Sequence, residues 1–174
     1  MDMDFLVLAE KRCSVRKFMD KTIPQQIIDK ILHAGFYAPT ACNRQPQKIL
    51  VISSEDGMKR LRRCTECHFN APAAMLICYN KNECWIRSYD GKSSGDIDAS
   101  IVATHMMLEA TTLGIGTTWV MHFIPEAVKC EFEMPHDVEP VALLVMGYPS
   151  SEAEPSSMHS SFRPIEELVV YNKF

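Results

Sequence analysis

The sequence predicts an α+β fold in which helices cover a mixed β-sheet, in a single domain of residues 1–174. Two observations lead to this prediction. Segments with apolar residues at helical spacing alternate with short apolar, β-branched runs that are typical of buried strands. In addition, 47% of the 174 residues are hydrophobic and 23% are charged, which is the composition of a globular protein with a core of ordinary size.

The first half of the chain is expected to contain three helices and two strands. A capping box at residues 22–25 would begin the second helix, because Thr22 and Gln25 can satisfy free amides of its first turn. Pro24 is tolerated at that position. The expected helices cover residues 5 to about 12, from the cap at Thr22 to about Phe36, and 56–67, and the expected strands cover residues 48–52 and 74–79.

The segment 98–113 is the clearest helix of the sequence, because its apolar residues recur at three- and four-residue steps. Ile101 and Leu108 lie off that stripe, so we expect the helix to be buried on most sides. Gly114 can end it in the left-handed conformation. The remaining elements are strands over 117–120 and 141–146, a short helix from Pro125, and a helical turn with an apolar tail over 164–174.

Charge and hydropathy exclude several classes of function. The net charge is −4, and the short basic run at residues 59–63 is typical of a solvated helix face rather than of a nucleic-acid surface. The apolar runs are far shorter than the roughly 20 residues of a membrane-spanning helix. Residues 1–4 are acidic where a secretory signal would be basic. The seven cysteines are therefore expected to be reduced thiols of a cytoplasmic protein.

The segment 12–18 carries the first group of side chains that suit a ligand. If the chain is extended here, Arg12, Ser14 and Arg16 point to one side, because side chains alternate along a strand. Two guanidinium groups and a hydroxyl on one side can clamp an anion through charged hydrogen bonds. The alternative is an exposed basic turn.

Three further segments carry polar or glycine-rich patterns. In the loop 38–46, small and amide side chains between two prolines could offer hydrogen bonds to a flat polar ring, although a plain turn has the same composition. Gly114 and Gly116 would let the backbone approach a ligand closely, but they follow a helix and are not a dinucleotide-binding fingerprint. The last segment is 147–149, followed by a serine-rich loop and Arg163.

These four segments, in this order, resemble the motifs of the nitroreductase family of flavoproteins, in its short branch. The resemblance extends over about residues 5–174. It implies the nitroreductase-like α+β fold, with a central, mostly antiparallel mixed sheet flanked by helices, and an intertwined homodimer. It also implies that FMN lies in a groove between the two subunits.

The resemblance assigns the residues around the cofactor. Arg12 and Arg163 would hold the phosphate, and Arg16 would favour the anionic reduced flavin by stabilising charge near its pyrimidine end. Pro39, Thr40 and Asn43 would come from the partner chain, and an amide near His122 would face the flavin N5. The full set of expected FMN-contacting residues is Arg12, Cys13, Ser14, Arg16, Pro39, Thr40, Ala41, Asn43, Gln45, Trp119, Met121, His122 and Arg163.

The resemblance implies an NAD(P)H-dependent flavin oxidoreductase. NAD(P)H would donate a hydride to flavin N5 and leave, and a nitroaromatic, quinone or free flavin would then be reduced in the same space. His122 is a candidate proton donor, with a purely structural histidine as the alternative. No metal, nucleic acid or membrane is expected as a partner.

Other interpretations remain open at this stage. Cys64, Cys67 and His68 match a haem c attachment motif, although that modification belongs to exported proteins. A zinc or iron–sulfur site could use Cys64, Cys67, Cys78 and Cys84. A non-enzymatic flavin carrier or sensor on the same fold is the third alternative.

Overall fold

The computed structural model describes residues 4–174, so most of the acidic start considered above lies outside the described residues. One sheet has the strand order β1-β2-β4-β3, and each neighbouring pair is antiparallel. A parallel bridge joins Ser14 to Thr117 at the outer edge of β3. The predicted mixed, mostly antiparallel sheet is therefore confirmed, and within residues 4–174 its parallel pairing is this one bridge. The strands are β1 (Gln47–Ile52), β2 (Ala73–Asn80), β3 (Gly116–Val120) and β4 (Val138–Gly147).

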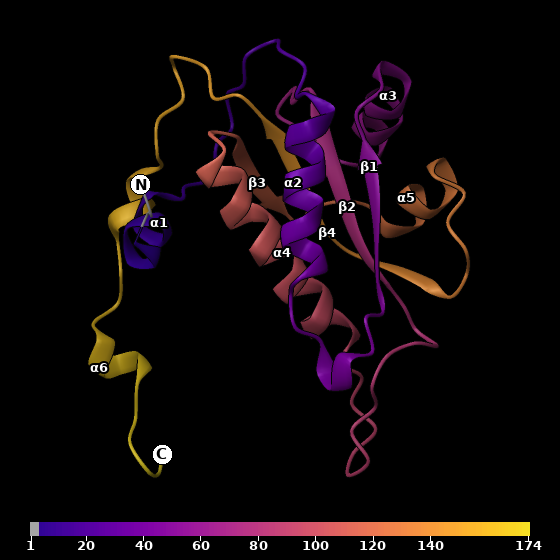
Figure 1. The fold of residues 1–174 in the computed structure, drawn as a ribbon, viewed down its shortest axis with the longest axis vertical. Coiled ribbons are helices and arrows are strands. Elements are labelled where there is room, and N and C mark those ends of the chain that lie inside the picture. Colours follow the sequence, from indigo (N-terminus) through magenta and orange to yellow (C-terminus); the bar gives the residue numbers. More distant parts are fainter. Residues whose placement is uncertain (1–3) are drawn as a thin grey trace.

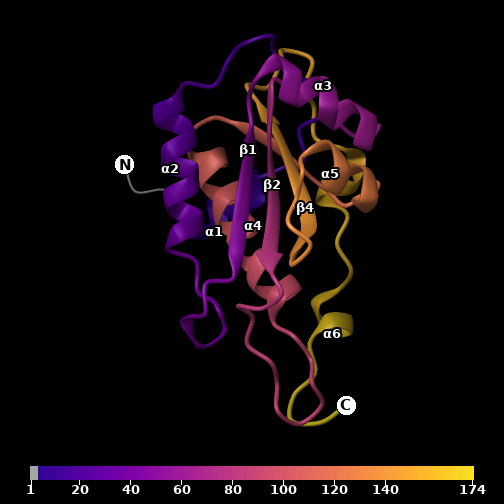
Figure 2. The ribbon, with the colours of Figure 1, turned by 90° about the vertical axis from the view of Figure 1, so that its right-hand side faces the viewer.

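Helices cover both faces of the sheet. Figures 1 and 2 show α2 and α4 on one face, and α3 and α5 on the other. The helices are α1 (Phe5–Lys11), α2 (Gln25–Phe36), α3 (Glu55–Cys64), α4 (Gly95–Thr112), α5 (Pro125–Glu131) and α6 (Ile165–Leu168), with short 3₁₀ turns η1 (Ala41–Asn43) and η2 (Ser157–Ser160).

The core consists of two layers separated by the sheet. Along β2, Met75 and Ile77 pack toward α2 and α4, whereas Leu76 and Cys78 pack toward α3 and α5. Successive side chains of a strand point to opposite faces. Because both faces are covered, β2 is apolar at nearly every position, which is why it was recognisable in the sequence as a continuous apolar run.

Two of the predicted helix boundaries are wrong. The capping box at residues 22–25 does not form: Pro24 occupies the N-cap of α2 without a side-chain hydrogen bond, and Ile23 is buried in the core. Helix α3 ends at Cys64 rather than at residue 67, because Thr65 is extended and its hydroxyl donates to the carbonyl of His122. The local pattern did not reveal these tertiary contacts.

Helix α4 is longer than predicted and less completely covered. It begins at Gly95, where a Cβ would lie 2.3 Å from the Tyr79 ring. Ile101 is only partly buried, and Ile97 is 51% exposed. Gly114 follows the helix with a φ of 73°, so the predicted left-handed end is confirmed. One face of α4 is thus open in the single chain.

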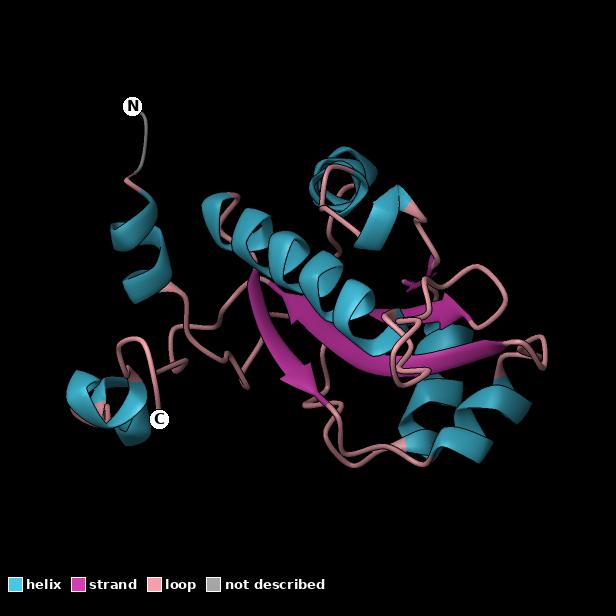
Figure 3. Cartoon of the chain, turned by 90° about the horizontal axis from the view of Figure 1, so that it is seen from below, coloured by secondary structure: helices cyan, strands magenta, loops and turns pink. Residues whose placement is uncertain are grey.

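The two ends of the chain lie outside the layers. Figures 1 and 3 show α1 and the C-terminal segment with α6 to one side of the sheet, where α1 contacts α4. His159 Nε2 lies 3.0 Å from the carbonyl oxygen of Glu10, which links the two segments. Both expose large apolar side chains, including Phe5, Phe162 and Tyr171. Among residues 4–174, none of the helices has both the length and the apolar character needed to cross a bilayer.

Candidate functional site

The segment with Arg12, Ser14 and Arg16 lies against the free edge of β3. Val15 N donates to the carbonyl of Thr117 at 2.9 Å, and the Thr118 hydroxyl donates to the carbonyl of Val15. The segment is therefore extended, which was one of the two conformations that the sequence left open. Since side chains alternate along an extended chain, Arg12, Ser14 and Arg16 share the side opposite Val15.

Gly116 has a different role from the one expected. A Cβ at this position would lie 2.7–2.9 Å from three atoms of the Val15 side chain. The missing side chain thus lets Val15 and the 12–16 segment approach β3, rather than admitting a ligand.

The three arginines of the predicted FMN site, Arg12, Arg16 and Arg163, have different surroundings. In the described part of the chain, no carboxylate pairs with Arg12 or Arg16. The Arg16 guanidinium lies 5.9 Å from the centre of the Phe69 ring. Arg163 lies on the C-terminal segment, where its Nε donates to Glu167 at 3.1 Å. Arg12 and Arg16 can therefore bind an anion directly. Arg163 would first have to release the Glu167 carboxylate.

A turn of residues 64–70 packs against the segment that follows β3. Ile124 N donates to the carbonyl of Cys64, and Thr65 bonds His122, so the turn and the 122–124 segment are tied together. Trp119 is half-buried there, and Met121 and His122 are exposed. Phe69 was not among the predicted site residues, because its proximity to Arg16 depends on this tertiary contact.

The cysteines of the metal and haem interpretations lie in different surroundings. Cys64 is the fully buried last residue of α3 and its thiol donates to the carbonyl of Arg60, so a haem could not reach its sulfur without unpacking that helix. Cys78 lies in the core of β2, whereas Cys84 contacts the carbonyl of Asn80. Burial raises the pKa of the Cys64 and Cys84 thiols, and that of Cys78 to about 12. Within residues 4–174, no three potential metal ligands gather into a metal-binding group.

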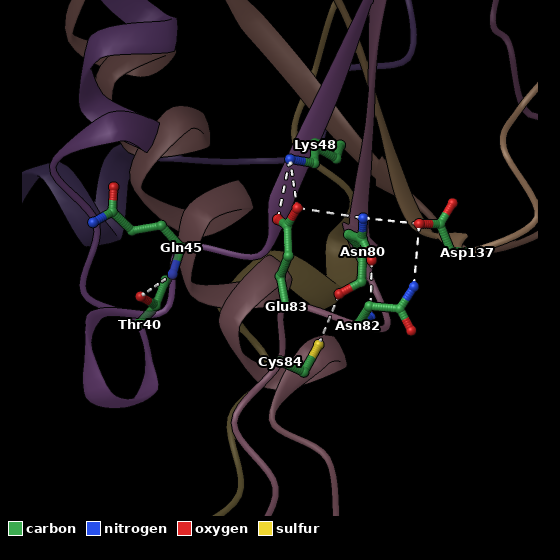
Figure 4. Close-up of polar contacts among 8 residues, drawn as sticks. All are labelled: Thr40, Gln45, Lys48, Asn80, Asn82, Glu83, Cys84 and Asp137. Carbon is green, nitrogen blue, oxygen red and sulfur yellow. Dashed lines mark hydrogen bonds and ion pairs between the residues drawn. The ribbon is translucent and has the colours of Figure 1, made fainter.

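The loop of residues 40–45 leads from α2 into β1 at the other edge of the sheet. The Thr40 hydroxyl accepts a hydrogen bond from Gln45 N at 3.0 Å (Figure 4). Ala41 N donates to the Asp98 carboxylate at 2.9 Å. Pro39, Asn43 and Gln45 are exposed.

Polar contacts fix the end of the sheet beside this loop. Lys48 pairs with Glu83 at 3.1 Å, and the Asn80 amide donates to Asp137 at 3.0 Å (Figure 4). The base of the 81–94 segment is therefore anchored to β1 and β2.

One chain does not bring the predicted site residues together. The 12–16 segment lies at β3 and the 40–45 loop at β1, which are the two edges of the four-stranded sheet. Three strand spacings separate these edges, which corresponds to roughly 14 Å. The loop also lies at the Gln47–Tyr79 end of the sheet, whereas Ser14 joins near the Gly116–Gly147 end. The predicted site residues thus form two separate groups in one chain, which we call the two partial sites.

Comparison with known proteins decides the family. The model of the nitroreductase family matches residues 9–74 and 64–148, most of the chain. The chain belongs to the nitroreductase family. It is similar to the solved structure of a nitroreductase family protein from Clostridium difficile 630, with 39% identity, a TM-score of 0.94, and 99% of this chain and 100% of that chain covered. The family and the fold predicted from the sequence are confirmed.

Two relatives of this nitroreductase family member have names that indicate chemistry. A protein of Methanothermobacter thermautotrophicus, named as an NADH dehydrogenase/NAD(P)H nitroreductase, is 26% identical over 163 residues, covering 85% of this chain and 78% of the relative. The FMN reductase [NAD(P)H] of Bacillus subtilis is 25% identical over 158 residues, covering 80% and 64% respectively.

Proposed function

We propose that the protein is an FMN-dependent oxidoreductase that uses NAD(P)H to reduce nitroaromatics, quinones or free flavins. The coarser part of this proposal, an NAD(P)H-dependent flavin oxidoreductase, agrees with the family and with the names of its relatives. We propose further that residues 1–174 act as one FMN-binding domain in the cytoplasm. The observation that carries the proposal is the placement of the two partial sites at opposite edges of the sheet.

A homodimer would complete each site. A second copy that places its 40–45 loop beside the 12–16 segment of the first would unite the predicted residues. The terminal segments support such an arrangement, because Phe5, Leu6 and Val7 and the tail around Tyr171 are exposed. The open face of α4, with Ile97, adds to this surface. Exposed large apolar side chains in such number are typical of an interface.

The donors at β3 fit the phosphate and ring of FMN. Arg12 and Ser14 would bind the phosphate, joined by Arg163 once it releases Glu167. Arg16, stacked beside Phe69, would stabilise negative charge at the pyrimidine end of the ring. When bound, FMN supplies hydride transfer through N5. Backbone groups near Met121 would orient the ring, and exposed His122 could give a proton to the acceptor.

Anaerobic reduction tests the proposal. Purified protein loaded with FMN is mixed with NADH or NADPH while the flavin absorbance is followed. We expect rapid bleaching, and recovery of the yellow colour when a nitroaromatic or quinone is added. Bound FMN that neither nicotinamide reduces would instead indicate a flavin carrier. Strictly monomeric protein that binds no FMN would refute the proposed function altogether.

A further inference from the structure

The 40–45 loop has a backbone that residues with a Cβ rarely adopt. Cys42, Asn43 and Gln45 have φ angles of 50°, 52° and 51°, in the left-handed region that clashes with a side chain. Hydrogen bonds within the loop are local, such as Asn43 N to the carbonyl of Thr40 at 3.0 Å. A disfavoured backbone persists only when its surroundings hold it in place.

Asp98 supplies the hydrogen bond that ties this loop to the core. It lies in the first turns of α4 and is only 2% exposed. One carboxylate oxygen accepts from Ala41 N at 2.9 Å, and the other accepts from the Ser94 hydroxyl at 2.7 Å. Its bond to Ala41 joins residues 57 positions apart.

The buried carboxylate has no cation to compensate it. Across residues 4–174, none of the ion pairs includes Asp98. Burial of an unpaired charge is costly, so the two donors and the N-terminal end of α4 must stabilise it. A leucine or alanine would fill this position at lower cost if it served packing alone.

We infer that Asp98 is a positioning residue of the flavin site, whose carboxylate holds the 40–45 loop in the shape that meets FMN on the partner copy. This inference rests on the proposed function, because contact between the loop and FMN is part of that proposal. Ser94 extends the link, since its backbone N also donates to the carbonyl of Trp85 at 2.9 Å. A cavity of about 170 Å³ lies between Ala41 and Trp85. Asp98 therefore joins the loop, α4 and the 85–94 segment.

Variants on both sides of the hydrogen bond test the inference. Asp98→Ala removes the acceptor, and Ala41→Pro removes the donor at the first position of η1, where proline is tolerated. Asp98→Asn keeps an acceptor for Ala41 and can donate to Ser94. The matched control is Asp96→Ala, an exposed carboxylate of the same helix turn.

The readouts are the FMN dissociation constant, the hydrogen exchange of the Ala41 amide, and kcat and KM with NADPH. We expect Asp98→Ala and Ala41→Pro to weaken FMN binding about 10- to 100-fold, because the loop loses the hydrogen bond that holds its FMN-contacting shape. The Ala41 amide should lose protection in Asp98→Ala. Asp98→Asn and Asp96→Ala should retain both the protection and the affinity.

The outcomes separate this inference from the proposed function. If the unaltered protein binds FMN but Asp98→Ala and Ala41→Pro bind it equally well, the positioning role is overturned and the proposed function stands. The same conclusion follows if Asp96→Ala weakens binding as much as Asp98→Ala. If the unaltered protein binds no FMN, the proposed function fails, and the role of Asp98 fails with it. If Asp98→Ala does not fold, the FMN affinities of Ala41→Pro and Asp98→Asn are compared instead. Weaker binding by Ala41→Pro supports the positioning role, and equal binding by the two variants overturns it.

Discussion

Adding one methyl group at Gly116 should detach the arginine-bearing segment from the sheet. A Cβ there would lie 2.7 Å, 2.8 Å and 2.9 Å from Cγ2, Cβ and Cγ1 of Val15. Because the Cβ of Val15 is among these atoms, rotation of its side chain cannot relieve the contact. The backbone of Val15 must move, although it is hydrogen-bonded to Thr117 and Thr118.

The expected size of the effect follows from these contacts. Overpacking of this kind destabilises the folded state by about 1–3 kcal/mol. The lower entropy of alanine in the unfolded chain offsets about 0.5–1 kcal/mol of this. We therefore expect Gly116→Ala to lower the free energy of unfolding by about 1–2 kcal/mol. FMN affinity should fall as well, because Arg12 and Arg16 move with Val15.

A double-mutant cycle with Val15→Gly identifies the cause. Urea unfolding and FMN titration of Gly116→Ala, Val15→Gly and the double variant should show a coupling of at least about 1 kcal/mol. Gly114→Ala is the matched control, since a Cβ there meets no atom within 4 Å. Its left-handed backbone should cost about 1 kcal/mol without coupling to Val15. Additive effects of Gly116→Ala and Val15→Gly would refute the reasoning.

Three further predictions concern charge, pH and assembly. Arg12→Ala should weaken FMN binding about 10- to 100-fold through the loss of a charged hydrogen bond, whereas Lys30→Ala, at an exposed lysine of α2, should leave it unchanged; equal affinity in a titration of both variants would argue against the phosphate assignment. Burial raises the pKa of Cys78 to about 12 from 9.0, so the unfolded thiol ionises first and the free energy of unfolding should fall as pH rises from 9 toward 12; a Cys78→Ala variant with the same pH slope would contradict this. Replacing the exposed Leu168 and Val170 by aspartate should produce a protein that is monomeric in analytical ultracentrifugation and that binds no FMN. A dimer that persists would exclude the C-terminal tail from the interface.

Periodicity along the sequence revealed the elements of the fold. Helix and strand repeats are local, so the apolar stripe of α4 and the doubly buried run of β2 were visible without tertiary information. Boundaries that depend on distant contacts were missed. The end of α3 at Cys64 depends on the bond between Thr65 and His122, and Thr22 was misjudged because Pro24 and buried Ile23 set the start of α2.

The sequence by itself determined the family and the order of its four motifs, whereas the extended conformation of residues 12–16 depends on their pairing with β3. The tertiary structure alone decided that the 12–16 segment and the 40–45 loop lie at opposite edges of the sheet, since strand order does not follow from local periodicity. It also decided the contacts of Gly116 with Val15, of Arg16 with Phe69 and of Asp98 with Ala41. The physical reason is the same for all three. Each contact joins residues far apart in the chain, and the local sequence around one residue does not indicate which distant residue it contacts.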